Sequence, residues 1–344
     1  MERSDSKKRI NKILQIIFPL LLGAVIMVWT YRGFDFQGVS AALTDMDYGW
    51  MALSLVFGVF GHLFRGWRWV LSLEPLDEHP KSANCVYAVF VSYATNLLVP
   101  RIGEVSRCGI LLKYDNVSFT KSLGTVVTER LIDTLCVLLI TGATLLLQSG
   151  VFVSFFAHTG TRAASFSHLF TSVNFFITLA CMVVLIIFGI FLLRKLAIFA
   201  KVRGIIDNIW QGCLSVRNVK NFPLYLTYTI GIWICYFFQF YVAFFAFDFS
   251  AHLGWVAGLV MFVVGSIAVA VPTPNGAGPW HFAVITMMMM YGISKDQAGI
   301  FALLVHGIQT FLLILLGIYG MVALPLTNKS FTNKNSLKNS LKNS

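Results

Sequence analysis

The stretch "NLLVPRIGEVSRCGILLKY", residues 96–114, decides how this chain can be threaded through a membrane. Its charged and helix-breaking residues are Pro100, Arg101, Gly103, Glu104 and Arg107. Proline lacks a backbone N–H and disfavours helix at the residue before it, and glycine tolerates a tight reversal. The stretch therefore predicts a chain reversal between Pro100 and Gly103, with charged side chains close to it.

The composition indicates a membrane protein. The 344 residues are 57% hydrophobic and 12% charged, and the mean hydropathy is +0.75. A soluble domain is about 45–50% apolar and about 25% charged. Several apolar runs approach the roughly 18–20 residues that cross a hydrocarbon core of about 30 Å. We expect an all-α integral membrane protein.

The net charge of +11 is concentrated in three segments. Residues 1–12 carry a net +3, residues 194–222 a net +5, and residues 326–344 a net +4. Cytoplasmic loops of membrane proteins are enriched in Lys and Arg. All three segments, and with them both termini, are therefore expected on the cytoplasmic side of the cell (inner) membrane. The pattern describes membrane topology and gives no reason to expect a nucleic-acid partner.

This orientation determines how the apolar segments are threaded. We expect about six spanning helices, at residues 13–30, 48–71, 122–148, 168–193, 223–247 and 298–324. Arg65 and Arg68 would then mark the inner membrane interface. Because flanking segments lie on one side, residues 82–112 and 255–292 must each enter and leave through one face.

These two segments are therefore predicted to be re-entrant helical hairpins that enter from opposite faces, with tips meeting near the midplane. The alternative makes residues 82–99 a full span, but it places the basic segment 194–222 outside, which the charge rule disfavours.

The predicted domain organisation is simple. Residues 1–325 form one polytopic membrane domain. Within it, residues 194–222 form an amphipathic helix on the inner leaflet, because apolar residues recur there at helical spacing. Residues 326–344 form a basic, low-complexity and disordered cytoplasmic tail.

Six charged residues fall in or beside the apolar segments. They are Arg101, Glu104 and Arg107 in the first hairpin and Glu129, Arg130 and Asp133 in the motif "ERLID" of the next helix. One unpaired charge at a helix centre costs about 2.5–3.5 kcal/mol on insertion scales, so these residues must be paired or hydrated. Glu129 and Asp133 repel each other at i,i+4, and we expect Arg101 and Arg107 to pair with them. The pairs either clamp the hairpin or line a polar cavity for a charged substrate.

The second hairpin has its own chain-breaking stretch, "PTPNGAGPW" at residues 272–280. Pro279 suits the first turn of a helix, where its missing N–H costs nothing. That helix and the one restarting after Arg101 would both direct free N–H groups at the midplane, an arrangement that favours anions. The commonest anions in a bilayer are lipid phosphates.

The motifs "PRIGEVSR", "ERLID" and "PTPNGAG", in this order over nearly the whole chain, resemble the flippase-like transmembrane region of lysylphosphatidylglycerol synthases. The resemblance implies movement of an anionic or aminoacylated phospholipid, or another phosphate-bearing lipid, between leaflets. The expected lipid path is lined by Asn96, Pro100, Arg101, Gly103, Glu104, Arg107, Glu129, Arg130, Asp133, Pro272, Pro274, Asn275, Gly276, Gly278 and His281.

The chain departs from the family pattern in two ways. Asn275 replaces the first glycine of the third motif, and His281 stands about where the family has an acidic residue. His281 either titrates near neutrality or bonds to the backbone of the tip. The soluble aminoacyl-transferase domain of the synthases is not expected, because the sequence ends about twenty residues after the last apolar segment. Transferase activity is therefore not inherited from the resemblance.

Two other functions stay open. The chain could be a non-catalytic membrane subunit that recruits a soluble transferase through residues 194–222. It could also be an intramembrane lipid-modifying enzyme that uses Glu104, Glu129 or Asp133 as acid and base, although no nucleophile–base pair is evident. The histidines lack metal-binding spacing, so we expect no metal, no cofactor and no catalytic residue. Membrane phospholipids are the expected partners, and a homo-oligomer is left open.

Overall fold

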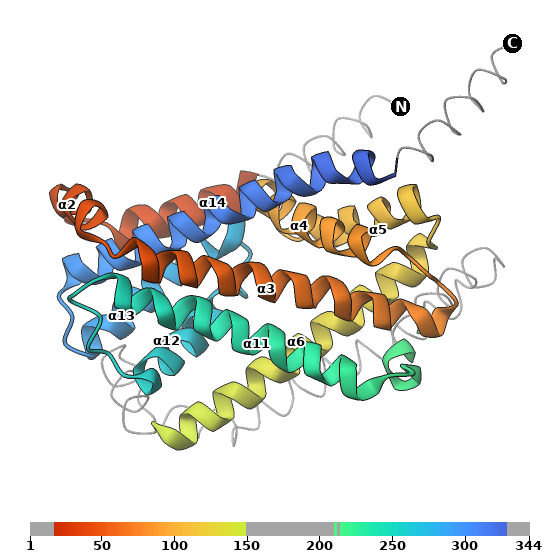
Figure 1. The fold of residues 1–344 in the computed structure, drawn as a ribbon. Helices are drawn as coiled ribbons and strands as arrows, with labels where there is room; N and C mark the ends of the chain where they lie inside the picture. Colours follow the sequence, from red (N-terminus) through yellow and green to blue (C-terminus); the bar gives the residue numbers. More distant parts are fainter. Residues whose placement is uncertain (1–16, 149–209, 212–213, 329–344) are drawn as a thin grey trace, which may run out of the picture.

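The computed structural model describes residues 17–148, 210–211 and 214–328, and within these ranges the chain forms helices and turns without any strand (Figure 1). The helices are Ile17–Thr30, α2 (Gln37–Asp45), α3 (Tyr48–Leu73), α4 (Ser82–Leu98), α5 (Ile102–Asp115), α6 (Phe119–Leu147), α11 (Phe222–Val242), α12 (Trp255–Ala268), α13 (Pro279–Met290) and α14 (Lys295–Thr327). The predicted all-α class is confirmed for these residues.

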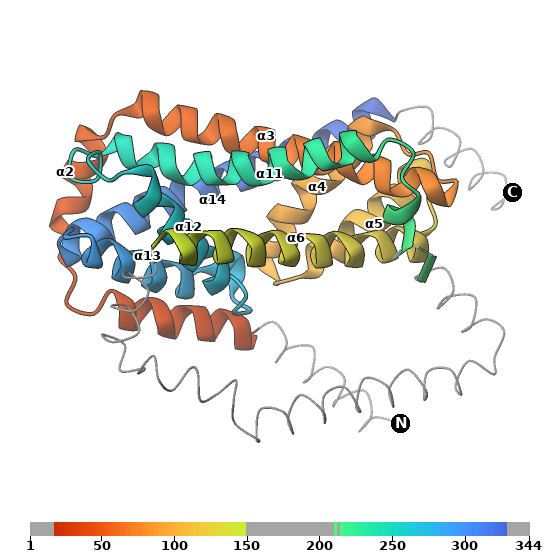
Figure 2. The same ribbon diagram turned by 90° about the horizontal axis from the view of Figure 1, so that it is seen from below.

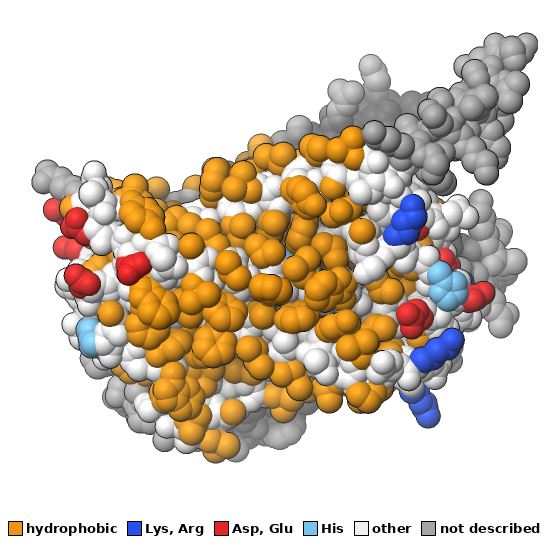
Figure 3. Space-filling view, in the orientation of Figure 1, with side chains coloured by type: hydrophobic (Ala, Val, Ile, Leu, Met, Phe, Trp, Pro, Cys, Tyr) orange, Lys and Arg blue, Asp and Glu red, His pale blue; other side chains and the backbone are white. Residues whose placement is uncertain are grey.

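Three described helices are long and apolar enough to cross a membrane: Phe119–Leu147, Phe222–Ala246 and Lys295–Thr327. Ile17–Thr30 and Trp255–Ala268 are shorter apolar helices. Much of the face shown in Figure 3 is apolar, and only 11% of the most apolar 18 residues of α6 are buried. A face this apolar is stable in lipid and not in water.

The three long helices and Ile17–Thr30 overlap predicted spans, whereas Trp255–Ala268 lies in the predicted second hairpin. α3 has 26 residues and covers the predicted span at 48–71. The predicted span at 168–193 lies outside the described residues, as do most of the predicted amphipathic segment and all but three residues of the predicted tail. α14 continues to Thr327, and Asn328 after it is buried.

The long helices pack closely because small residues lie at their contacts. α3 and α11 run side by side (Figures 1 and 2). A Cβ on Gly61 of α3 would lie 2.7 Å from the ring of Tyr236 on α11. In the contact between α4 and α14, a Cβ on Gly317 would lie 2.2 Å from the Cβ of Ala94. Glycine at these positions allows the close helix approach that small residues provide in membrane bundles.

Local signals explain where the helices begin. Asp47 accepts hydrogen bonds from the N–H groups of Gly49 and Trp50, at 2.8 and 3.2 Å, and so caps α3. Ser294 caps α14 in the same way. Pro279 occupies the first position of α13, as the sequence predicts. Capping satisfies N–H groups that have no partner within the helix.

Two helix pairs fold back on themselves at opposite ends of the bundle. α4 and α5 reverse through residues 99–101, and α12 and α13 through the turn Pro274–Gly276, so each pair returns to the end at which it started (Figures 1 and 2). The turn Pro274–Gly276 contacts α4, so the second pair reaches the first. These are the segments predicted as hairpins.

The two ends of the bundle differ in charge. In Figure 3 acidic side chains alone are visible at the end where α2 lies, whereas the other end carries Lys and Arg side chains together with acidic ones. The base of α4 and α5 lies at this second end, where Asn84 Nδ2 donates to both carboxylate oxygens of Asp115 at 2.9 Å. Asn328 Nδ2 in turn donates to Asn84 Oδ1 at 2.8 Å. These bonds tie both helices of the first pair to the end of α14.

Candidate functional site

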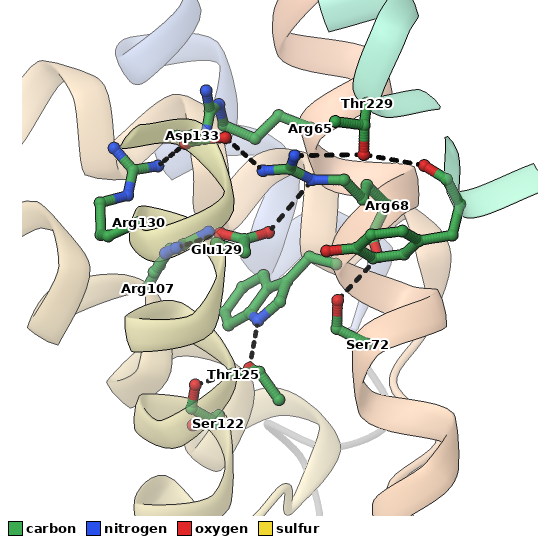
Figure 4. A network of polar contacts seen from close by, with 12 residues as sticks. Arg65, Arg68, Ser72, Arg107, Ser122, Thr125, Glu129, Arg130, Asp133 and Thr229 are labelled. Atoms are coloured by element: carbon green, nitrogen blue, oxygen red, sulfur yellow. Dashed lines mark hydrogen bonds and ion pairs between the residues drawn. The ribbon is translucent and has the colours of Figure 1, made fainter. Parts of the chain in front are cut away.

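Six charged side chains from three helices meet inside the bundle (Figure 4). We call them the arginine cluster: Arg65 and Arg68 from α3, Arg107 from α5, and Glu129, Arg130 and Asp133 from α6. Five of the six are buried, and Arg130 is the exposed member, with 44% of its side chain accessible.

Asp133 is held by three guanidinium groups. Arg65 Nη1 donates to Oδ2 at 2.7 Å and Arg68 Nη2 donates to Oδ1 at 3.0 Å. Arg130 Nη2, one turn earlier on the same helix, lies 3.1 Å from Oδ2. The carboxylate therefore joins α3 to α6 through charge-assisted hydrogen bonds, which are the strong kind.

Glu129 is the deeper carboxylate, with no accessible surface. Arg107 Nη2 donates to its Oε2 at 2.5 Å, and Arg68 Nε lies 3.9 Å from its Oε1. The prediction that Arg107 pairs with one of the two carboxylates of α6 is confirmed, and the partner is Glu129. The predicted pairing of Arg101 with Glu129 or Asp133 is wrong, since Arg101 is exposed at the start of α5 and makes no ion pair with any residue that the structure describes.

Aromatic rings hold the arginines in place. The guanidinium carbon of Arg107 lies 4.5 Å from the ring centre of Trp69, and the Trp69 Nε1–H donates to Thr125 Oγ1 at 2.9 Å. Arg65 Nε donates to the Tyr236 hydroxyl at 3.2 Å. Cations over aromatic faces gain about 2 kcal/mol when both are desolvated, so the rings stabilise charges that the bundle buries.

Arg65 and Arg68 are the site residues that the sequence analysis misplaced. They were expected at the inner membrane interface, but their side chains are 3% and 0% accessible and point into the bundle. Their i,i+3 spacing was the available signal, because it places both on one face of α3. The sequence does not show whether that face meets lipid head groups or another helix.

A cavity of about 30 Å³ adjoins the arginine cluster. Its lining residues are Arg65, Val89, Ser92, Tyr93, Asn96, Glu104, Arg107 and Arg130. A water molecule occupies about 30 Å³ in the liquid, so the cavity holds roughly one water. Two buried polar atoms among its lining residues have no hydrogen-bond partner in the described part of the chain, the donor Arg107 Nε and the acceptor Glu104 Oε2.

The start of α5 is closed by side chains of the chain itself. Asn96 Oδ1 accepts a hydrogen bond from the Gly103 N–H at 2.8 Å. Gly103 lies within α5, not in the reversal as predicted, and a Cβ there would be 2.1 Å from the Ser92 carbonyl oxygen. Pro100 does lie in the reversal. Because the Gly103 N–H already donates to Asn96, the N-terminus of α5 has one free N–H fewer to offer an anion than the sequence predicts.

The second tip forms a separate group. Pro272 is exposed, and Pro274, Asn275 and Gly276 form the turn. The Gly278 N–H lies 3.4 Å from His281 Nδ1, so His281 bonds to the backbone of the tip, the second of the two expected roles. Among the described residues, no hydrogen bond or ion pair joins these tip residues to the arginine cluster. The predicted path residues thus fall into two sets, and the contact of this turn with α4 is the connection between them.

Comparison with known proteins agrees with the motifs. The family model described as "Lysylphosphatidylglycerol synthase TM region" matches residues 16–317. The chain belongs to this family. The match includes both helix pairs and the whole arginine cluster, so the resemblance stated from the motifs is confirmed.

Two relatives of this lysylphosphatidylglycerol synthase TM-region protein extend the comparison. It is 25% identical over 228 residues to a UPF0104 membrane protein of Methanocaldococcus jannaschii, which covers 64% of this chain and 90% of that protein. It is 26% identical over 140 residues to the glycosyltransferase AglD of Haloferax volcanii, which covers 40% of this chain and 22% of that protein. No solved structure matches the chain.

Proposed function

We propose that this member of the lysylphosphatidylglycerol synthase TM-region family moves a phosphate-bearing lipid between the leaflets of a membrane. Anionic and aminoacylated phospholipids are the expected substrates. The observation that carries the proposal is the surplus of guanidinium groups over paired carboxylates in the arginine cluster. Four arginines share Glu129 and Asp133, while Glu104 beside them pairs with no described residue.

The surplus favours an anion, and the geometry suits a phosphate. Guanidinium groups present planar forks of donors that match phosphate oxygens. The Nε–H of Arg107 is buried beside the cavity and finds no acceptor among the residues that the structure describes. Charged side chains inside a membrane are costly and by default mark a substrate path. A phosphate entering the cavity would supply the missing acceptor and balance the cationic charge.

Entry of a head group requires part of the lining to move, because the cavity holds about one water. Arg130 is the member that can move, since its side chain is 44% accessible and Asp133 keeps two other arginines without it. In this proposal α4–α5 enters the membrane from the cytoplasmic face and α12–α13 from the opposite face. The head group crosses beside their tips while the acyl chains stay against the apolar outer surface of the helices.

Reconstitution tests the proposal with one variant and a matched control. Purified protein in liposomes is given fluorescent phosphatidylglycerol or phosphatidylcholine, and a membrane-impermeant quencher reports how fast inner-leaflet label becomes accessible. Arg130→Gln removes one guanidinium from the cavity while Arg65 and Arg68 still hold Asp133. Lys113→Gln removes an exposed charge from α5.

We expect the wild type and Lys113→Gln to exchange labelled lipid at similar rates, and Arg130→Gln to be at least tenfold slower. Equal rates in Arg130→Gln and the wild type would remove the arginine cluster from the path. Absence of exchange for both lipids in the wild type would reject translocation.

A transferase-recruiting subunit is the second candidate. The match to a protein named as a glycosyltransferase favours this candidate. The match covers only 22% of that longer protein, so in that protein the matched region is joined to a much larger remainder. In this case a soluble transferase should co-purify with the chain, and lipid exchange should be absent. An intramembrane enzyme is less favoured, since two of its three candidate acid–base residues, Glu129 and Asp133, are engaged by guanidinium groups and so poorly placed to transfer protons. Glu104 is the candidate that pairs with no described residue.

A further inference from the structure

The turn between α12 and α13 is fastened to α14 by a closed ring of hydrogen bonds. Asn275 Nδ2 donates to Thr310 Oγ1 at 2.9 Å, and that hydroxyl lies 3.5 Å from His306 Nδ1. His306 Nε2 lies 3.1 Å from the Asn275 carbonyl oxygen and closes the ring. Asn275 belongs to the turn, whereas Thr310 and His306 belong to α14, so this ring holds the tip in place.

His281, beside this ring, is tied to the same turn from α13. The centres of the His281 and His306 rings are 4.6 Å apart. His281 Nδ1 is the acceptor for the Gly278 N–H at 3.4 Å. A nitrogen that accepts from a backbone N–H carries no proton, so this bond requires a neutral His281. In the ring, the Asn275 carbonyl can only accept, which places the proton of neutral His306 on Nε2.

No charged side chain among the described residues pairs with His281 or His306 to balance a proton. His281 is 2% accessible. The rings facing the pair are Tyr31, after the helix Ile17–Thr30, and Trp280 on α13. Within the described ranges, no Asp, Glu, Lys or Arg of α4, α11, α12 or α14 forms an ion pair with either histidine. A proton on one ring would therefore sit buried, uncompensated, and close to the other ring.

The turn has a conformation that depends on these bonds. Asn275 has φ +50°, and Gly276 and Gly278 have φ +73° and +93°. A non-glycine residue at positive φ is unfavourable and persists where the surrounding structure holds it. Gly278 also packs against the N-terminal helix, since a Cβ there would lie 2.9 Å from the Gly23 carbonyl oxygen. Loss of the histidine bonds should let the turn leave this conformation.

We propose that His281 and His306 form a proton-released latch. While both are neutral they hold the turn at residues 272–278 against α14, and uptake of a proton by His281 frees the turn. The bond from Gly278 to His281 is lost because both nitrogens then carry hydrogen. Because the turn contacts α4, which contributes Asn96 to the cavity, its release changes a neighbour of the arginine cluster. The latch itself does not depend on the proposed movement of lipid.

Hydrogen–deuterium exchange of the whole protein in nanodiscs tests the latch without any transport assay. Protection of peptides covering residues 270–282 is measured from pH 7.5 to pH 3, corrected for the intrinsic pH dependence of exchange, with α11 peptides as the reference. The range extends below ordinary histidine titration, because burial without a counter-charge disfavours the protonated ring. The matched variant is His281→Asn with His306→Gln, which keeps an acceptor at the first site and a donor at the second but cannot titrate.

We expect wild-type protection of the turn to fall at least tenfold towards pH 3, while the double variant stays protected throughout. Thr310→Val removes the hydroxyl that links Asn275 to His306 and should lower protection of the turn at pH 7.5 as well. This variant gives an independent result if the double variant does not fold. Wild-type protection that is constant with pH would overturn the proposal. An equal loss in the double variant would do so too, since that loss could not come from either histidine.

Discussion

Removal of Arg107 should expose the cost of a buried carboxylate. Arg107→Met keeps most of the side-chain volume but leaves Glu129, which is fully buried, with only the more distant Arg68 Nε at 3.9 Å. Breaking a buried ion pair from one side costs about 3–5 kcal/mol, and the lost contact with Trp69 adds up to about 2 kcal/mol. We therefore expect the free energy of unfolding to fall by at least 3 kcal/mol, measured by steric trapping in bicelles.

The double variant separates the ion pair from simple loss of packing. Arg107→Met with Glu129→Gln leaves neither charge unpaired, so it should be more stable than Arg107→Met alone by about 2–3 kcal/mol, the coupling expected for contacting residues. Lys113→Met, on the exposed face of α5, is the control and should change stability by less than about 0.5 kcal/mol. A cost below 1 kcal/mol for Arg107→Met, or no recovery in the double variant, would refute the reasoning.

Two further predictions concern the start of α5. Gly103→Ala places a Cβ 2.1 Å from a carbonyl oxygen of α4 and should lower the unfolding temperature sharply, whereas Gly109→Ala, with open space around it, should leave it unchanged or slightly raised. Equal effects of the two substitutions would contradict the close packing of α4 and α5. Arg101→Gln should change the free energy of unfolding by less than about 0.5 kcal/mol, since Arg101 is exposed and has no ion pair among the described residues. A loss above 1 kcal/mol would mean that Arg101 is held by a contact absent from this fold.

The arginine cluster shows which ion pairs can be predicted from the signs and spacing of charged residues in the sequence. Repulsion between Glu129 and Asp133 at i,i+4 required cations from another element, and this reasoning found Arg107 correctly. It missed Arg65 and Arg68 because a charged residue in the last third of an apolar helix fits the membrane interface as well as a buried pair. Only the rotation of α3 about its axis, set by its packing on α11 and α6, directs these two arginines inward.

The second tip shows the complementary case. Pro279 predicted the start of α13 correctly, because a missing N–H is a local property of the residue. The partner of Asn275 was not predictable, because Thr310 is 35 residues away and is brought near only when α14 returns beside the turn. The sequence leaves two alternative roles open for His281, and the distance from its Nδ1 to the Gly278 N–H shows the backbone bond.

The sequence by itself determined that this is a helical membrane protein and where its chain reverses, because hydropathy, proline and glycine act over a few residues. It also determined that buried charges of both signs must meet, because leaving them apart in the membrane is too costly. The tertiary structure decided which charges meet, how little space they leave, and that a histidine pair holds the second tip. Those outcomes depend on the lateral order and rotation of helices that are distant in sequence, and no local pattern specifies them.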